Sequence, residues 1–126
     1  MIEKKFEYPI FVKPSNAGSS VGVSKAHNRK ELIDALNFAA KYDRKVLVEE
    51  FINGREVECA VLGNDNPIAS TVGEILPSNE FYDYNAKYID GNSKTIIPAN
   101  LPAETIDKIR EYAVKAFKAL DCAGLS

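Results

Sequence analysis

Apolar and polar positions alternate along the first part of the chain with two different periods. An apolar run at residues 8–12 predicts a strand that ends at Lys13-Pro14. After a loop of small residues, Asn28 with Glu31 three positions later has the form of a capping box. Apolar side chains then recur at helical spacing, which predicts a helix over residues 29–42.

The middle of the chain has the pattern of short strands joined by turns. Residues 45–51 and 55–62 are rich in Val, Leu and Phe, and Asn53-Gly54 between them is a strong hairpin signal. We expect these two segments to pair as antiparallel strands. Residues 68–75 follow another turn cluster and predict a third strand of the same sheet.

The last third begins with a long segment that has no sustained period, residues 76–94, a feature typical of functional or disordered loops. Residues 95–97 predict a short strand. One helical stripe follows, with a proline near its first turn and a glycine just past its end: Pro102, Ile106, Ile109, Ala113, Phe117, Leu120 and Gly124. The expected fold class is α+β, with a mostly antiparallel sheet packed against two helices.

Size and composition restrict the class of protein. A length of 126 residues predicts a single domain spanning 1–126, and 45% hydrophobic with 27% charged residues is typical of soluble globular proteins. The net charge of −2 and the lack of a dense Lys/Arg run argue against nucleic acid as the main partner. We see no signal peptide and no run long enough to cross a membrane, so we expect no membrane partner and a cytoplasmic location.

Cysteine and histidine offer few candidates for chemistry. Cys59 and Cys122 lie in a predicted strand and at a predicted helix end, so we interpret both as reduced thiols without a disulfide or zinc site. His27, the only histidine, stands beside a helix cap and is assigned no role.

A loop of small residues follows the first predicted strand, from Lys13 through Ser19, Ser20 and Val21 to Gly22. Small residues let a backbone approach a ligand, and successive N–H groups with two hydroxyls suit phosphate oxygens, to which Lys13 adds a point charge. The lysine precedes the loop, so the Walker spacing is absent and a P-loop NTPase is not expected. A flexible hairpin turn would have the same composition.

Carboxylates gather on the two strands after the first helix. Glu49 and Glu50 close one strand, while Glu56 and Glu58 lie two apart on the next and therefore share a face. These groups could accept hydrogen bonds from ribose hydroxyls or an adenine amino group. A solvated sheet face shows the same alternation, and on the residues alone we favour that interpretation.

Aromatic residues and one lysine gather in the long loop, in the run FYDYNAKY at residues 81–88. Such a loop closes onto the body of the domain or onto a ligand, and its lysine could reach a phosphate. Simple packing of a surface loop explains the run equally well.

Together and in this order, the three features resemble the ATP-grasp ligases and, among them, the D-alanine-D-alanine ligases. The run FVKPSNAGSSVGVSKA resembles the strand and phosphate-covering loop of that family, VEEFINGREVECAVLG its adenine- and ribose-binding hairpin, and FYDYNAKY its closing loop. The resemblance covers residues 8–125, in the central ATP-binding portion of such a ligase.

The resemblance implies an ATP site formed by Lys13, Ser19, Ser20, Val21, Glu49, Glu50, Phe51, Ile52, Glu56 and Lys87. In it, Lys13 contacts the phosphates and the turn at Ser19 and Ser20 folds over them as a lid. Glu49 faces the adenine amino group. Phe51 and Ile52 line the adenine slot.

The remaining roles in the resemblance concern the ribose and the reaction itself. Glu56 holds the ribose hydroxyls, and Lys87 approaches the transferred phosphate. Tyr88 closes the loop toward the substrate and toward Ser19 or Ser20. Ser19, Lys87 and Tyr88 are therefore the candidate catalytic residues.

The implied reaction joins two D-alanines through an acyl-phosphate made from ATP, in the synthesis of peptidoglycan precursors. Family members have an earlier N-terminal domain and a later segment that binds two magnesium ions, and nothing in this sequence corresponds to either. We therefore expect a fragment of a homodimeric enzyme, with no metal ligands of its own and no activity alone.

Two alternatives stay open. One is another ATP-grasp ligase, of the D-alanine-D-lactate or carboxylase type. The other is a module that does not catalyse a reaction and either binds a nucleotide or is purely structural.

Overall fold

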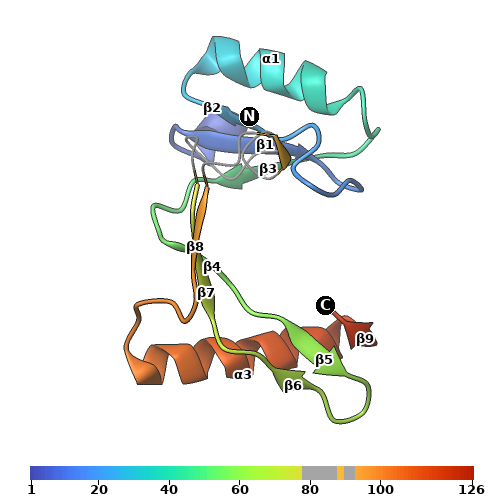
Figure 1. Cartoon of the computed structure of the whole chain (residues 1–126). Helices are drawn as coiled ribbons and strands as arrows, with labels where there is room; N and C mark the ends of the chain where they lie inside the picture. Colours follow the sequence, from blue (N-terminus) through green and yellow to red (C-terminus); the bar gives the residue numbers. More distant parts are fainter. Residues whose placement is uncertain (78–87, 90–92) are drawn as a thin grey trace. The chain divides into compact units, whose positions relative to one another are not determined.

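A computed structural model describes residues 1–77, 88–89 and 93–126 (Figure 1). It consists of helices and antiparallel sheets, which confirms the α+β class. The chain divides into two compact units, unit 1 formed by Met1–Gly54 with Ser78–Asn92 and unit 2 by Arg55–Pro77 with Ser93–Ser126. This division rests on contacts within the chain and does not show whether either unit folds independently. The single domain spanning residues 1–126 therefore stays a prediction.

Unit 1 is a three-stranded antiparallel sheet covered on one face by a helix (Figure 1). Its strand order is β2-β1-β3, so β1 is the central strand. The elements in chain order are the 3-10 helix η1 (Ile2–Lys4), β1 (Ile10–Pro14), β2 (Ser24–Ala26), α1 (Arg29–Ala39) and β3 (Val46–Glu50).

The core of unit 1 lies between β1 and α1. Ile10 and Val12 of β1 are fully buried, and the α1 residues Leu32, Ala35 and Ala39 are also buried. Alternate residues of β1 point to opposite faces of the sheet. The side chains at the intervening positions of β1 therefore face away from α1.

The predicted N-cap at Asn28 is confirmed, but the return bond from Glu31 goes to the residue before the cap. The backbone N–H of Glu31 donates to Asn28 Oδ1 at 3.0 Å, and the Glu31 carboxylate accepts in return from the N–H of His27 at 2.8 Å. Hydrogen bonds with the backbone N–H and the ring of His27 lower the pKa of the Glu31 carboxyl. The helix ends at Ala39, before the predicted end at residue 42, because the N–H groups of Lys41 and Tyr42 bond three residues back and tighten the last turn.

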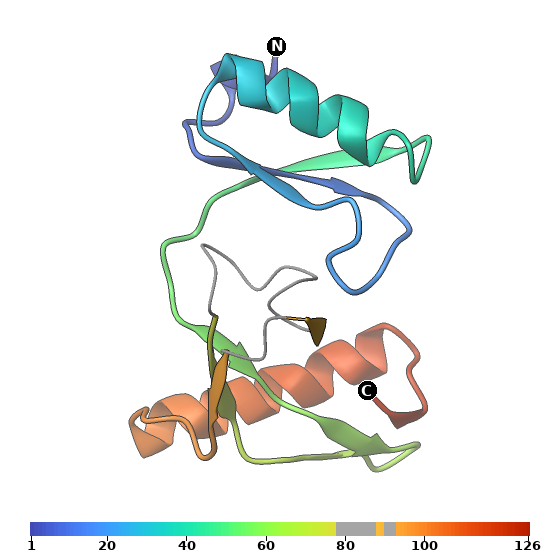
Figure 2. The same ribbon diagram turned by 45° about the horizontal axis from the view of Figure 1, so that its top comes forward.

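Unit 2 contains two further antiparallel sheets and one long helix (Figure 2). One sheet has the order β4-β7-β8, from Glu56–Glu58, Gly73–Leu76 and Lys94–Ile96. The other has the order β6-β5-β9, from Ile68–Ala69, Val61–Gly63 and Gly124–Leu125, and α3 (Ala103–Ala119) packs against β5 and β6. None of the helices in the described part of the chain has the length and hydrophobicity needed to cross a membrane.

The predicted hairpin around Asn53-Gly54 is wrong. β3 pairs with β1 over five positions and β4 pairs with β7, so the two segments belong to different sheets. Long-range pairing with β1 has overridden the local turn signal. The predicted strands at residues 55–62 and 68–75 also divide, the first into β4 and β5 and the second into β6 and β7. Three small sheets in the described residues replace the single expected one.

The connection between β1 and β2 has an unusual backbone. Ser19 (φ 54°), Ser20 (φ 59°) and Gly22 (φ 75°) all have positive φ. The N–H of Val21 donates to the carbonyl of Gly18 at 3.0 Å, which closes a turn with Ser19 and Ser20 at its centre. Positive φ at both central positions is the pattern of a type I′ turn.

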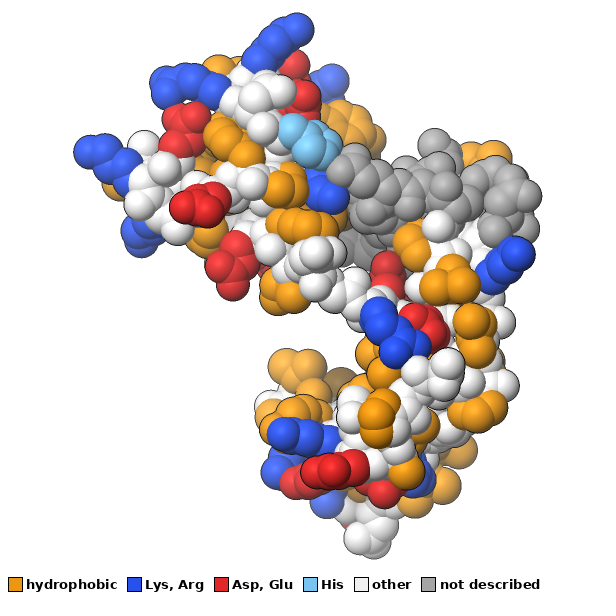
Figure 3. Space-filling view, turned by 90° about the vertical axis from the view of Figure 1, so that its left-hand side faces the viewer, with side chains coloured by type: hydrophobic (Ala, Val, Ile, Leu, Met, Phe, Trp, Pro, Cys, Tyr) orange, Lys and Arg blue, Asp and Glu red, His pale blue; other side chains and the backbone are white. Residues whose placement is uncertain are grey.

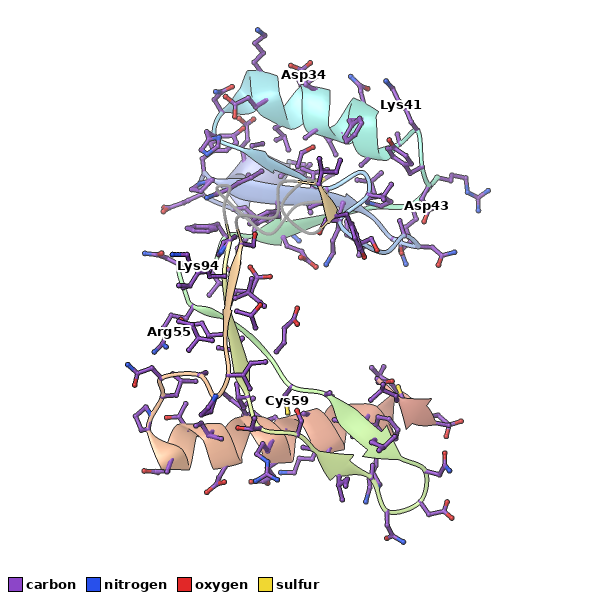
Figure 4. All side chains as sticks on the ribbon, in the orientation of Figure 1. Asp34, Lys41, Asp43, Arg55, Cys59 and Lys94 are labelled. Carbon is purple, nitrogen blue, oxygen red and sulfur yellow. The ribbon has the colours of Figure 1, made fainter. Side chains whose placement is uncertain are left out.

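A bidentate ion pair ties the start of β4 to β7. Arg55 Nε and Nη2 each donate to one carboxylate oxygen of Glu74 at 2.6 Å, and Nη2 also donates to the carbonyl of Asn100 at 2.9 Å. Glu74 is buried, and the hydrogen bonds from Arg55 lower the pKa of its carboxyl. Arg55 is labelled in Figure 4. The pair therefore satisfies a carboxylate that would be costly to bury alone.

We expect Gly22→Ala to destabilise the fold. A Cβ at Gly22 would lie 2.7 Å from Pro14 Cγ and 2.7 Å from Tyr42 Cδ2. The left-handed backbone costs a residue with a Cβ about 1–2 kcal/mol, and overpacking costs about 1–3 kcal/mol more. Urea unfolding should show this loss for Gly22→Ala but not for Gly18→Ala, because a Cβ at Gly18 meets nothing within 4 Å. Equal effects at both glycines would contradict the prediction.

The stabilisation from Glu74 should disappear in acid. Its pKa is lower in the folded chain than the ordinary value of about 4.3. The ionised Glu74 carboxylate therefore stabilises the fold fully when the pH is above the ordinary pKa. This stabilisation is lost as the pH falls through the lower pKa of the folded chain. We expect unfolding of Glu74→Gln and of the unchanged chain to differ at neutral pH and to converge in acid. Glu58→Gln, at an exposed position, is the control. If the difference in unfolding free energy between Glu74→Gln and the unchanged chain did not depend on pH, the ionised Glu74 would not be the source of the stabilisation.

Candidate functional site

Two oppositely charged side chains meet on the sheet face of unit 1 that points away from α1. Lys13 on β1 and Glu49 on β3 are diagonal neighbours across the ladder, and Lys13 Nζ lies 2.7 Å from Glu49 Oε1. Their side chains are 37% and 49% exposed. A pair this exposed contributes only about 0–1 kcal/mol, so an incoming anion can displace Glu49 from Lys13 at little cost.

Aromatic rings continue the same face beyond the end of β3. The rings of Phe11 and Phe51 lie 6.3 Å apart, and Lys25 Nζ lies 4.0 Å from the centre of the Phe51 ring. A cation at this distance is attracted to the ring and helps to fix its position. The face therefore combines two aromatic rings, tilted by 35° to each other, with charged groups of both signs, which suits a planar base attached to an anion.

The turn after β1 contacts the end of the long loop. Ser19 Oγ and Tyr88 OH lie 2.9 Å apart, within hydrogen-bonding distance. The two residues are 69 positions apart in the sequence, and both side chains are exposed. The structure thus brings together two of the three candidate catalytic residues. Lys87, the third, lies outside the described residues.

The other predicted site residues have less defined surroundings. Ser20 and Val21 belong to the same turn as Ser19 and are partly exposed. Glu50 is exposed and follows Glu49, so its side chain points to the opposite face of β3. Ile52 is 78% exposed. Glu56 is exposed on β4, in unit 2.

Sequence reasoning missed two residues of unit 1 that contact this region. Lys25 reaches Phe51 because β2 is antiparallel to β1, which sets Lys25 opposite Phe11; no local pattern predicts this register. The carboxylate of Asp43 accepts from the backbone N–H of Lys45 and of Asn16. The first bond is an Asx turn, which Asp43 just after a predicted helix could have indicated.

The described residues contain no group of three or more His, Cys, Asp or Glu side chains that could hold a metal ion. On the surface seen in Figure 3, Lys and Arg side chains lie among Asp and Glu side chains. The expectation that metal ligands lie outside this chain stays a prediction.

Comparison with known proteins gives one consistent family. A family model described as "D-ala D-ala ligase C-terminus" matches residues 1–126. A D-alanine–D-alanine ligase of Acetivibrio thermocellus is 76% identical over 125 residues, 99% of this chain and 33% of the relative. One from Ruminiclostridium cellulolyticum is 71% identical over 127 residues, 99% of this chain and 34% of the relative.

Solved structures agree with the sequence comparisons. The VanG D-Ala:D-Ser ligase of Enterococcus faecalis matches with a TM-score of 0.86 and 47% identity, over 99% of this chain and 36% of that one. The D-alanine-D-alanine ligase of Coxiella burnetii matches with a TM-score of 0.75 and 33% identity, over 94% of this chain and 30% of that one.

The extent of these matches agrees with the extent of the resemblance in the sequence. The chain spans about a third of the length of the curated relatives it matches. The family match extends over the whole chain, including the loop after β1, the end of β3 and the run at residues 81–88. The chain belongs to the D-Ala-D-Ala ligase C-terminal domain family.

Proposed function

We propose that this chain supplies the ATP-binding surface of a ligase that joins two D-alanines. The observation that carries the proposal is the Lys13–Glu49 pair, which lies on the sheet face that points away from α1, between the ring of Phe51 and the turn at Ser19 and Ser20. Membership of the family supports the same interpretation. The product would be a peptidoglycan precursor.

The nucleotide would lie along this face from base to phosphates. Glu49 would accept a hydrogen bond from the adenine amino group, and Phe51 and Ile52 would border the base. Lys13, released from Glu49, would then pair with phosphate oxygens. The half-exposed ion pair supports this exchange, because both partners are accessible and weakly held.

Two further glutamates complete the proposed nucleotide site. Glu56, which is exposed on β4, would accept hydrogen bonds from the ribose hydroxyls. The Glu50 side chain points to the opposite face of β3, so Glu50 would border the base through its backbone. Both roles follow from the family resemblance.

The turn at Ser19 and Ser20 would cover the phosphates, with Val21 in the same turn. Its hydroxyls and backbone N–H groups are the donors that phosphate oxygens require. The Ser19–Tyr88 contact supports a role for the long loop in closing the site, because it joins the phosphate-covering turn to the residue after Lys87. We infer that Lys87 approaches the transferred phosphoryl group.

In the proposed reaction, a carboxylate oxygen of the first D-alanine attacks the γ-phosphorus of ATP and ADP leaves. The amine of the second D-alanine then attacks the carbonyl carbon, and inorganic phosphate leaves as the peptide bond forms. Phosphoryl transfer depends mainly on positioning and on neutralisation of charge. Lys13 and Lys87 would supply positive charge from this chain, and magnesium, when bound, would supply the remainder.

The second substrate distinguishes this proposal from a close alternative. VanG of Enterococcus faecalis is titled a D-Ala:D-Ser ligase and is 47% identical to this chain. Curated D-alanine–D-alanine ligases are more similar, at 76% and 71% identity. We therefore infer D-alanine as the second substrate, and D-serine is the alternative.

Calorimetric titration with ATP, with and without magnesium, tests the proposed surface. We expect saturable binding by the chain and a loss of about tenfold or more in affinity for Lys13→Ala, because hydrogen bonds to charged groups contribute about 1.5–3 kcal/mol. Lys30→Ala removes an equal charge from an exposed position on α1, on the opposite side of the sheet, and should bind as the unchanged chain does.

Two results would count against the proposal. If Lys13→Ala bound ATP as tightly as the unchanged chain, Lys13 would have no role in phosphate binding. If the chain were folded by circular dichroism but gave no saturable heat, these residues would not form a nucleotide-binding surface on their own.

A further inference from the structure

The loop after β1 is held at its first end by one carboxylate. The backbone N–H of Asn16 donates to Asp43 Oδ2 at 2.8 Å, and the backbone N–H of Lys45 donates to Asp43 Oδ1 at 3.1 Å. Both oxygens of one side chain therefore connect two segments 27 residues apart in the sequence. The N–H of Ser15 adds a bond to the carbonyl of Lys45 at 2.9 Å. The start of the loop is thus tied to the α1–β3 connection, where Figure 4 labels Asp43.

The last part of the loop is held by the neighbouring residue. Gly22 is buried, and a Cβ there would lie 2.7 Å from the ring of Tyr42 and from Pro14. The Tyr42 ring in turn stands edge-on to Phe38 of α1, with centroids 5.3 Å apart and planes at 83°. The Tyr42 ring therefore packs against the backbone at Gly22.

Between these two anchors lies the turn that would cover the phosphates. Ser19 and Ser20 have φ of 54° and 59°, in the left-handed region that residues with a Cβ adopt at a cost. Such conformations persist only where the surrounding structure enforces them, and they gather at binding and catalytic sites. The anchors at Asn16 and Gly22 are the enforcing contacts that the structure shows on either side of this turn.

We propose that Asp43 and Tyr42 are positioning residues that hold the Ser19–Ser20 turn in its binding conformation before the nucleotide arrives. Neither residue belongs to the proposed nucleotide site. A turn that is already ordered loses less conformational entropy when the nucleotide binds. The affinity therefore rises for the ligand groups that the turn contacts. The inference that the turn binds phosphate rests on the proposed function. The inference that Asp43 and Tyr42 hold the turn does not depend on it.

Hydrogen exchange in the nucleotide-free chain tests the holding of the turn. The N–H groups of Val21 and Val23 bond to the carbonyls of Gly18 and Ser20, so they report on the turn directly. We expect Asp43→Ala to speed their exchange by about tenfold or more, as expected for lost bonds to a charged acceptor. Amide exchange within α1 should not change. Asp43→Asn keeps one oxygen acceptor and should show a smaller effect.

Asp34→Ala is the matched control, because it removes an exposed carboxylate from α1 of the same unit (Figure 4). Unchanged exchange at Val21 and Val23 in Asp43→Ala would overturn the proposal. So would a uniform increase that includes α1, because that pattern indicates loss of overall stability only.

Nucleotide titration separates this inference from the proposed function. We expect Asp43→Ala to weaken ATP binding by several-fold and AMP binding much less, so that the ratio of the two dissociation constants falls. A purely structural role would weaken both nucleotides equally and would contradict the inference. If exchange responds as expected but Lys13→Ala binds ATP normally, the positioning stands and the proposed nucleotide site fails.

Discussion

The alternation of side chains along β1 is the constraint on which unit 1 depends. Ile10 and Val12 are fully buried beneath α1, so the positions between them must face the other side of the sheet. A shift of one residue in register would bury Lys13 and expose the core. Hydrophobic burial therefore determines where Lys13 and Phe11 point, and it does so without any contribution from a ligand.

Because β1 is the central strand, its orientation also sets which side chains of β2 and β3 lie on each face of the sheet. β2 and β3 both pair with β1, which brings Lys25 to Phe51 and Glu49 to Lys13. These contacts are formed by residues far apart in the sequence but adjacent across two ladders. The face that points away from α1 is thus assembled by backbone pairing, and its Lys13–Glu49 pair is exchangeable because solvent reaches both side chains.

Unit 2 uses a different means to position its strands. Burial of Glu74 is tolerated because Arg55 supplies two hydrogen bonds and a charge, and Arg55 also binds the carbonyl of Asn100. Arg55 immediately precedes β4, so this network holds the chain at the start of the strand. The backbone at Glu56 is therefore fixed by its neighbour, while the Glu56 side chain stays exposed.

Local sequence determined the elements that depend on short-range contacts. The elements that were predicted and are present include the N-cap at Asn28, the apolar stripe of α3, the strand that ends at Lys13-Pro14 and the alternation at Glu56 and Glu58. The order of three motifs was also sufficient to identify the family, because that order does not depend on the geometry of any single motif.

Tertiary structure alone decided the pairing of strands and the support of the loop. Asn53-Gly54 has the local signal of a hairpin, yet β3 gains five paired positions with β1, and this longer ladder prevails. The hold of Asp43 on Asn16 and of Tyr42 on Gly22 likewise joins distant segments. Sequence patterns report local preferences, whereas these contacts depend on which distant residues the packed core brings together, and a linear pattern does not contain that information.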